Sequence, residues 1–170
     1  FHIGVLARLA ELDVLRRVEV LSCVSGGSII GAHYYLEVRK LLQSKPDDQI
    51  DRQDYIDIVA RVRKDFLAGV QRNIRMRVAL NPFQTIKMIF GSRYSRTMRA
   101  GELYETEIFS RVKDGGENGP RWLNGLFVCP VGPDGKLDYD FSLRRDNWRR
   151  QAKVPNLILN GATLNTGHNW

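Results

Sequence analysis

The pattern of apolar and polar positions predicts alternating helices and strands at the start of the chain. Residues 1–16 carry apolar side chains at helical spacing. Residues 18–24 form a short, β-branched apolar run, which is typical of a buried strand. Residues 27–43 return to helical spacing after the sequence Ser25-Gly26-Gly27. The pattern therefore predicts a helix followed by a strand–tight turn–helix unit.

The middle of the chain is predicted to be helical, and its last part is predicted to contain strands. The predicted helices span residues 52–80 and 102–111, and the predicted strands span 126–131, 137–142 and 156–160. We interpret residues 44–121 as a helical insertion or cap, which no linker separates from the rest. The α/β core would then comprise residues 1–43 and 122–170, arranged as an α/β sandwich.

Length and composition agree with one globular domain of ordinary core size. The sequence has 170 residues, of which 43% are hydrophobic, and it contains no run of 18 apolar residues. Its two cysteines, Cys23 and Cys129, lack metal-ligand spacing and fall in predicted core strands. We therefore expect both to be small buried side chains, and we expect no disulfide framework.

The turn at residues 23–27 carries the candidate chemistry. Cys23-Val24-Ser25-Gly26-Gly27 fits the nucleophile-elbow pattern G-x-S-x-G at every required position except the first, where Cys23 replaces glycine. A strand before the turn and a helix after it are the setting in which an elbow exposes its serine. The alternative is a plain glycine-rich turn without catalytic function.

The residues around this turn resemble the patatin-like phospholipase family. The first helix reads Phe-His-Ile-Gly-Val-Leu, similar to the family's F-H-x-G-V-L, and residues 24–32 are similar to its S-G-G-S elbow and following helix. Residues 155–167 resemble the family's N-A-T-x-L-x-T-G turn, with Gly161 as a one-residue departure. The resemblance is specific over residues 1–43 and 153–170.

The resemblance implies a fold and an activity. The fold is a three-layer α/β sandwich with a mainly parallel central sheet, and the activity is hydrolysis of fatty acyl esters of lipids. The family uses a Ser–Asp dyad, without a metal or organic cofactor. Ser25 would be its nucleophile, and Cys23, Gly26 and Gly27 would form the elbow.

The same comparison implies that part of the active site lies outside this sequence. The family's glycine-rich oxyanion loop precedes the helix at which the sequence begins, and its dyad aspartate follows the turn near residue 167. We therefore expect an internal fragment whose aspartate lies beyond Trp170, and which is inactive when isolated. A catalytically inactive membrane- or protein-binding module on the same fold is the alternative function.

Other candidate catalytic residues are weaker. Asp114-Gly115-Gly116 resembles the dyad turn, but it lies in a polar stretch rich in turn formers and precedes the family's expected position. We favour a surface turn there and keep Asp114 as an alternative dyad acid. A Ser–His–Asp triad would need His168, for which a solvated or structural role is the preferred interpretation, and His2 and His33 are also interpreted as structural.

The charge of the chain is concentrated in one region. The net charge is +7, and residues 61–99 contain ten Lys or Arg residues but a single acid, Asp65. Apolar residues alternate with these basic ones, so the region is either a solvated face over a packed helix or a contact with an anionic membrane surface. No motif for nucleic-acid binding accompanies it, so no nucleic-acid partner is expected. The compartment is not assigned.

Overall fold

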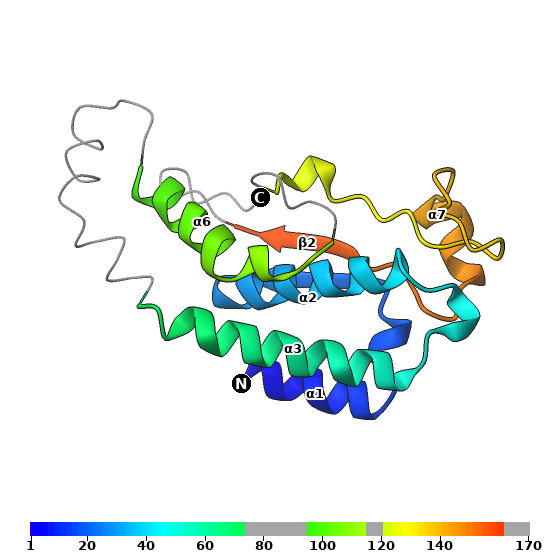
Figure 1. The fold of residues 1–170 in the computed structure, drawn as a ribbon, viewed down its shortest axis with the longest axis horizontal. Helices are drawn as coiled ribbons and strands as arrows, with labels where there is room; N and C mark the ends of the chain where they lie inside the picture. Colours follow the sequence, from blue (N-terminus) through cyan, green and yellow to red (C-terminus); the bar gives the residue numbers. More distant parts are fainter. Residues whose placement is uncertain (74–94, 115–120, 162–170) are drawn as a thin grey trace.

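The computed structural model describes residues 1–73, 95–114 and 121–161 (Figure 1). Within these residues the chain is mixed α/β, with five α-helices and one parallel two-stranded sheet. The α/β class predicted from the sequence is confirmed at this level. The α-helices are α1 (His2–Glu11), α2 (Gly26–Leu42), α3 (Arg52–Val70), α6 (Arg96–Glu107) and α7 (Leu143–Asp146), and the strands are β1 (Val20–Val24) and β2 (Asn156–Asn160).

The sheet joins two segments that are far apart in the sequence. β1 and β2 pair in parallel from Val20 opposite Asn156 to Val24 opposite Asn160. Side chains alternate between the faces of a strand, so Cys23 and its partner Leu159 share one face. α2 packs on both strands, and it runs beside β2 in Figure 1. Because the strands are parallel, their carboxyl ends meet at one edge, where Ser25 follows β1.

The core lies where α1, α2 and α3 pack together. Most of α2 from Ile30 onward is buried, which explains its near-continuous apolar pattern. α3 begins with a capping box in which Asp51 and Asp54 each accept a hydrogen bond from the other's backbone N–H. Four of its buried residues join the same cluster as α1 and α2, and they are Tyr55, Ile58, Val59 and Val62. α3, one of the two described α-helices within the expected insertion, therefore packs in the main core.

Several predicted boundaries differ from the structure. The first helix ends at Glu11 rather than at residue 16, because Asp13 takes a positive φ of 55° and a 3₁₀ turn follows at Leu15–Arg17. The predicted helix 102–111 instead starts at Arg96 and gives way to a 3₁₀ turn at Phe109–Arg111. The part of the predicted helix 52–80 beyond residue 73 lies outside the described residues.

The predicted strands 126–131 and 137–142 are wrong. Only the turn between them has the expected form, with Gly132 N–H donating to the Lys136 carbonyl and an antiparallel bridge between Val131 and Leu137. One further bond follows, from the Asp138 N–H to the Pro130 carbonyl at 2.8 Å. Because Pro130 has no N–H to donate in return, the pairing does not extend into a strand. Cys129 therefore lies in an irregular segment and is half-buried rather than inside a core strand.

Candidate active site

Ser25 occupies the tight turn between β1 and α2 with an unusual backbone conformation. Its φ is 53° and its ψ is −132°, and it is one of three non-glycine residues with positive φ in the described part of the chain. A serine that merely begins a helix has an extended backbone and accepts a hydrogen bond from an N–H in the first turn. A non-glycine residue held at such angles costs of order 1–3 kcal/mol, and this kind of strain is found chiefly at functional sites.

The hydroxyl of Ser25 is available for chemistry. Ser25 is exposed, and its side chain makes no capping hydrogen bond to α2. The helix begins immediately after it, so the free N–H groups and positive dipole end of this 17-residue helix face the same turn. An anion that forms next to Ser25 would be stabilised there. The Gly26 N–H follows the serine, as an oxyanion donor would.

The two glycines after Ser25 leave room at the turn. A Cβ on Gly26 would meet no atom within 4 Å, and a Cβ on Gly27 would stand 3.7 Å from Nε2 of His2. The close approach between strand and helix occurs instead at Cys23, whose side chain lies against Gly31. Cys23 is buried, and this burial raises the pKa of its thiol. Its role is therefore packing beneath the elbow.

Asn160 fixes the end of β1 just before the elbow. Its Nδ2 donates to Ser22 Oγ at 2.9 Å and to the Cys23 carbonyl at 3.0 Å. These bonds tie the carboxyl ends of both strands together beside Ser25. Asn160 was not among the candidate site residues predicted from the sequence. The available signal was a polar side chain at the carboxyl end of a predicted core strand, where α/β sheets place their ligands.

Asp114 lies far from Ser25 along α2. Its carboxylate is fully buried and accepts from Arg39 Nη1 at 2.7 Å and from Arg121 Nη2 at 3.0 Å. Arg39 follows Ser25 by 14 positions, which is roughly 20 Å along a helix axis. The structure therefore does not bring Asp114 to the serine. It holds the carboxylate in a buried ion-pair network rather than in a solvated surface turn.

The histidines are divided between the elbow and the interior. His2 lies against the first turn of α2, and His33 is completely buried farther along the same helix. His168, the residue required for the triad alternative, lies outside the described residues.

Part of the basic region is described, and several of its charges are paired within the fold. Arg61 Nε donates to Glu37 Oε2 at 2.8 Å, and Arg99 Nη1 donates to Glu102 Oε2 at 3.1 Å. Arg63 and Lys64 are exposed on α3. Residues 74–94 of this region lie outside the described residues. In the parts that the structure describes, no helix is long and apolar enough to span a bilayer.

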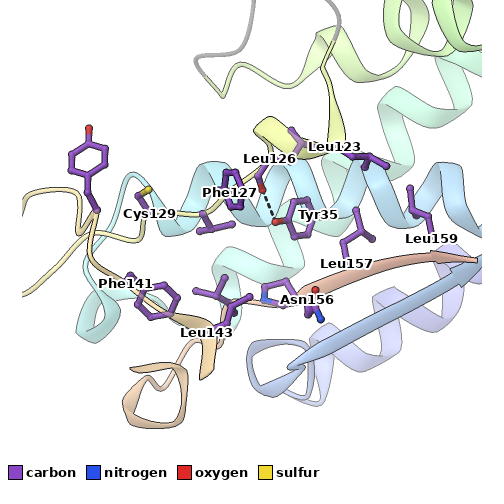
Figure 2. A pocket seen from close by; sticks show the side chains of 14 residues that line it. Tyr35, Leu123, Leu126, Phe127, Cys129, Phe141, Leu143, Asn156, Leu157 and Leu159 are labelled. Atoms are coloured by element: carbon purple, nitrogen blue, oxygen red, sulfur yellow. Dashed lines mark hydrogen bonds between the residues drawn. The ribbon is translucent and has the colours of Figure 1, made fainter. Parts of the chain in front are cut away.

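Two apolar cavities lie beside the elbow unit. One has a volume of about 660 Å³ and extends from Ser28 and Ile29 of α2 to Leu159 of β2. The other has a volume of about 650 Å³ and is also lined by Leu159. Figure 2 shows this second cavity, with Leu157 and Leu159 on the side of β2 that faces the segment around Leu123. Leu123, Leu126 and Leu159 line both cavities.

The hydrogen bond in Figure 2 fixes one wall of the second cavity. Tyr35 of α2 donates from its hydroxyl to the Leu126 carbonyl at 2.8 Å, which holds the 123–126 segment against the helix. The shared leucines make the two cavities neighbours along α2, and the first begins three residues after Ser25. Ser25 itself lines neither cavity, but the apolar space that begins at Ser28 suits a substrate with a long hydrocarbon chain.

Comparisons with known proteins add no relative. No protein-family model, no curated protein and no solved structure matches this chain. The likeness to patatin-like phospholipases therefore remains a resemblance of motifs, and the function must be argued from the site itself.

Proposed function

We propose that this chain carries the nucleophile of a serine hydrolase that cleaves fatty acyl esters of phospholipids or related lipids. The observation that carries the proposal is the backbone of Ser25, which has a positive φ at a residue that is exposed just after the end of β1. The apolar cavity that begins at Ser28 supports the lipid character of the substrate, because it offers an acyl chain an apolar lining that starts three residues after Ser25.

In the proposed reaction, Ser25 Oγ attacks the ester carbonyl while a general base accepts its proton. The tetrahedral oxyanion would receive a hydrogen bond from the Gly26 N–H, and the positive end of α2 would stabilise its charge. Collapse of this intermediate breaks the ester C–O bond, and the alcohol leaves with the proton from the base. Water then hydrolyses the acyl-enzyme. By the patatin resemblance the base is an aspartate, and none of the described carboxylates is assigned that role.

The same resemblance leads us to propose that β1 and β2 belong to the central sheet of a three-layer sandwich. Val20 and Val24 of β1 and Ile158 of β2 are 55%, 66% and 40% exposed on the face opposite α2. Apolar side chains on that face suit a sheet that is covered on both sides. An experimental structure of the protein that contains this sequence would test the arrangement.

Covalent labelling tests the nucleophile directly. The protein that carries this sequence is incubated with a fluorophosphonate probe, and its peptides are analysed by mass spectrometry. We expect a single adduct on Ser25, lost in Ser25→Ala and retained in Ser44→Ala, which alters an exposed serine just beyond the end of α2. Hydrolysis of a short-chain p-nitrophenyl ester and of phosphatidylcholine should follow the same pattern. Equal hydrolysis by the wild type and Ser25→Ala would refute the assignment.

We also propose that the C-terminal half of α3 contacts an anionic membrane surface. Leu67 and Val70 are 49% and 51% exposed there, close in sequence to exposed Arg63 and Lys64. Exposed apolar and basic side chains on one helix suit a bilayer interface. Co-sedimentation with phosphatidylglycerol vesicles should weaken in Lys64→Glu but not in Lys136→Glu, which alters an exposed turn. Binding that does not change with the charge of the lipid or with the salt concentration would contradict this contact.

An inactive lipid-binding module is the second candidate, and the apolar cavities favour it equally. It predicts binding of a fluorescent fatty acid that is the same in the wild type and in Ser25→Ala, with no adduct on Ser25. The labelling experiment therefore separates the two functions.

A further inference from the structure

A cluster of three side chains joins α2 to α3 away from the elbow. His33 and Glu37 lie one helical turn apart on α2, and Asp65 faces them from α3. One ligand atom from each residue lies within 4.8 Å of the other two. His33 is 0% exposed and Glu37 is 3% exposed. The three side chains thus meet in the interior, between the two longest described helices.

His33 has no hydrogen-bond partner at either ring nitrogen. Both Nδ1 and Nε2 are buried, and no polar atom of the described residues bonds to them. A buried polar group without a partner is costly and uncommon in a folded protein. A neutral imidazole presents a lone pair, which is the form that binds metals.

We infer that His33, Glu37 and Asp65 bind a divalent transition-metal ion, with Zn²⁺ as the best-fitting ion. One imidazole nitrogen and two carboxylate oxygens form a ligand set that Zn²⁺ accepts, with water at the remaining position. Zn–N and Zn–O bonds of about 2.0–2.2 Å place ligand atoms roughly 3–4 Å apart around the ion. The observed ligand atoms lie within 4.8 Å of one another, so the cluster would have to contract by no more than about 1–2 Å to reach that geometry.

The carboxylates of Glu37 and Asp65 each lie next to an arginine that is not part of the cluster. Arg61 Nε donates to Glu37 Oε2 at 2.8 Å, and Arg111 Nη1 lies 3.8 Å from Asp65 Oδ1. A carboxylate has lone pairs enough to accept from an arginine and to bind a metal at the same time. Ligating carboxylates are commonly oriented by such outer partners. The arginines also offset the repulsion between the two carboxylates, so the helices can pack before the ion binds.

The position of the cluster defines what the ion would do. His33 follows Ser25 by eight positions, roughly 12 Å along α2, so the ion would not touch the serine. It would instead tie the helix that carries the elbow to α3. The Asp65 side chain is 21% exposed, which leaves a path from solvent to the site. The inference is independent of the proposed hydrolase activity.

Zinc binding is tested on protein stripped of metal with a chelator. Equilibrium dialysis with Zn²⁺ should give one ion per wild-type chain, and thermal unfolding should show Tm raised by about 5 °C at about a hundredfold excess of Zn²⁺ over its Kd. Asp65→Asn removes one ligand but keeps the side-chain volume, and it should weaken binding at least about tenfold. Asp57→Asn makes the same change at an exposed position of α3 and should bind like the wild type.

A second ion and a second variant test whether the metal binds at this cluster rather than at other side chains of the protein. Co²⁺ bound to the cluster should give visible absorption bands that Asp65→Asn loses and Asp57→Asn keeps. Glu37→Gln should also weaken binding, with circular dichroism used to verify that its helices remain. The inference is overturned if the wild type binds no stoichiometric Zn²⁺, or if Asp65→Asn and Asp57→Asn bind it equally well.

Discussion

Gly31 of α2 lies so close to Cys23 of β1 that a Cβ on the glycine would overlap the cysteine sulfur and stand 3.4 Å from the cysteine Cβ. The usual elbow pattern has a glycine at the position of Cys23. Here the larger residue is on the strand and the glycine is on the helix. The close packing of strand and helix is therefore retained although the first glycine of the pattern is missing.

Replacing Gly31 with alanine should destabilise the protein. The added methyl group overlaps Cys23 Sγ, and overpacking of this kind costs about 1–3 kcal/mol in the free energy of unfolding, measured by urea denaturation. Gly101→Ala is the control, because a Cβ there meets no atom within 4 Å and alanine favours helix α6 by about 0.5–1 kcal/mol. In the Gly31→Ala background, Cys23→Gly should recover part of the loss, and simple additivity of the two changes would contradict the contact.

The strained backbone of Ser25 should lower the free energy of unfolding of the protein. Ser25→Gly relieves the positive φ and should raise the free energy of unfolding by about 1 kcal/mol, while it removes the proposed nucleophile. Ser28→Gly, inside the first turn of α2, should have the opposite effect on stability, since glycine weakens a helix interior. Urea denaturation of both variants measures whether the free energy of unfolding rises or falls in each. Loss of stability in Ser25→Gly would show that the backbone of Ser25 is not strained.

The elbow unit could be predicted because its signals come from residues that are neighbours in the sequence. Contacts between residues that are distant in the sequence leave no such local signal. A β-branched run, a Ser-Gly-Gly turn and helical spacing lie next to one another in the sequence, so β1, α2 and β2 were found with small errors at their ends. The partners of the candidate site are distant. Asn160 binds the Cys23 carbonyl across 137 positions, and Asp114 pairs with Arg39 across 75. Such pairs depend on how helices and strands pack.

The wrong strands have a related physical cause. Apolar residues such as Phe127 and Tyr139 suggested sheet faces, but these side chains are 73% and 78% exposed. A periodic pattern indicates a strand only when one of its faces is covered. His33 shows a related limit, because it was interpreted as structural on its predicted helix, and no local signal pointed to Asp65 on another helix.

The buried carboxylate of Asp114 should be more important for stability than for catalysis. Asp114→Asn leaves Arg39 and Arg121 without their buried counter-charge, and we expect the free energy of unfolding to fall by about 3 kcal/mol. Glu11→Gln breaks the exposed pair with Arg8 and should change it by less than about 1 kcal/mol. Both values come from urea denaturation. If Asp114→Asn abolished ester hydrolysis while leaving the fold stable, Asp114 would instead be the dyad acid.

Tyr55 should make the protein sensitive to alkaline pH. Burial raises the pKa of its phenol, an effect that nearby Arg150 and Arg16 oppose, and the hydroxyl has no hydrogen-bond partner among the described residues. The unfolded chain loses this proton near pH 10, whereas the folded protein keeps it to higher pH. The free energy of unfolding is therefore maintained below about pH 10 and falls above it by up to about 1.4 kcal/mol per pH unit for this group.

Tyr55→Phe removes both the ionisation and the unpartnered hydroxyl. At pH 7 the variant should be as stable as the wild type or more stable, because the buried hydroxyl loses its hydration without gaining a hydrogen bond. Between about pH 10 and 11 its free energy of unfolding should fall less steeply than that of the wild type, in urea denaturation at each pH. Tyr139→Phe changes an exposed phenol and should follow the wild-type curve. A Tyr55→Phe variant that is less stable at pH 7 would mean that the hydroxyl is bonded in solution.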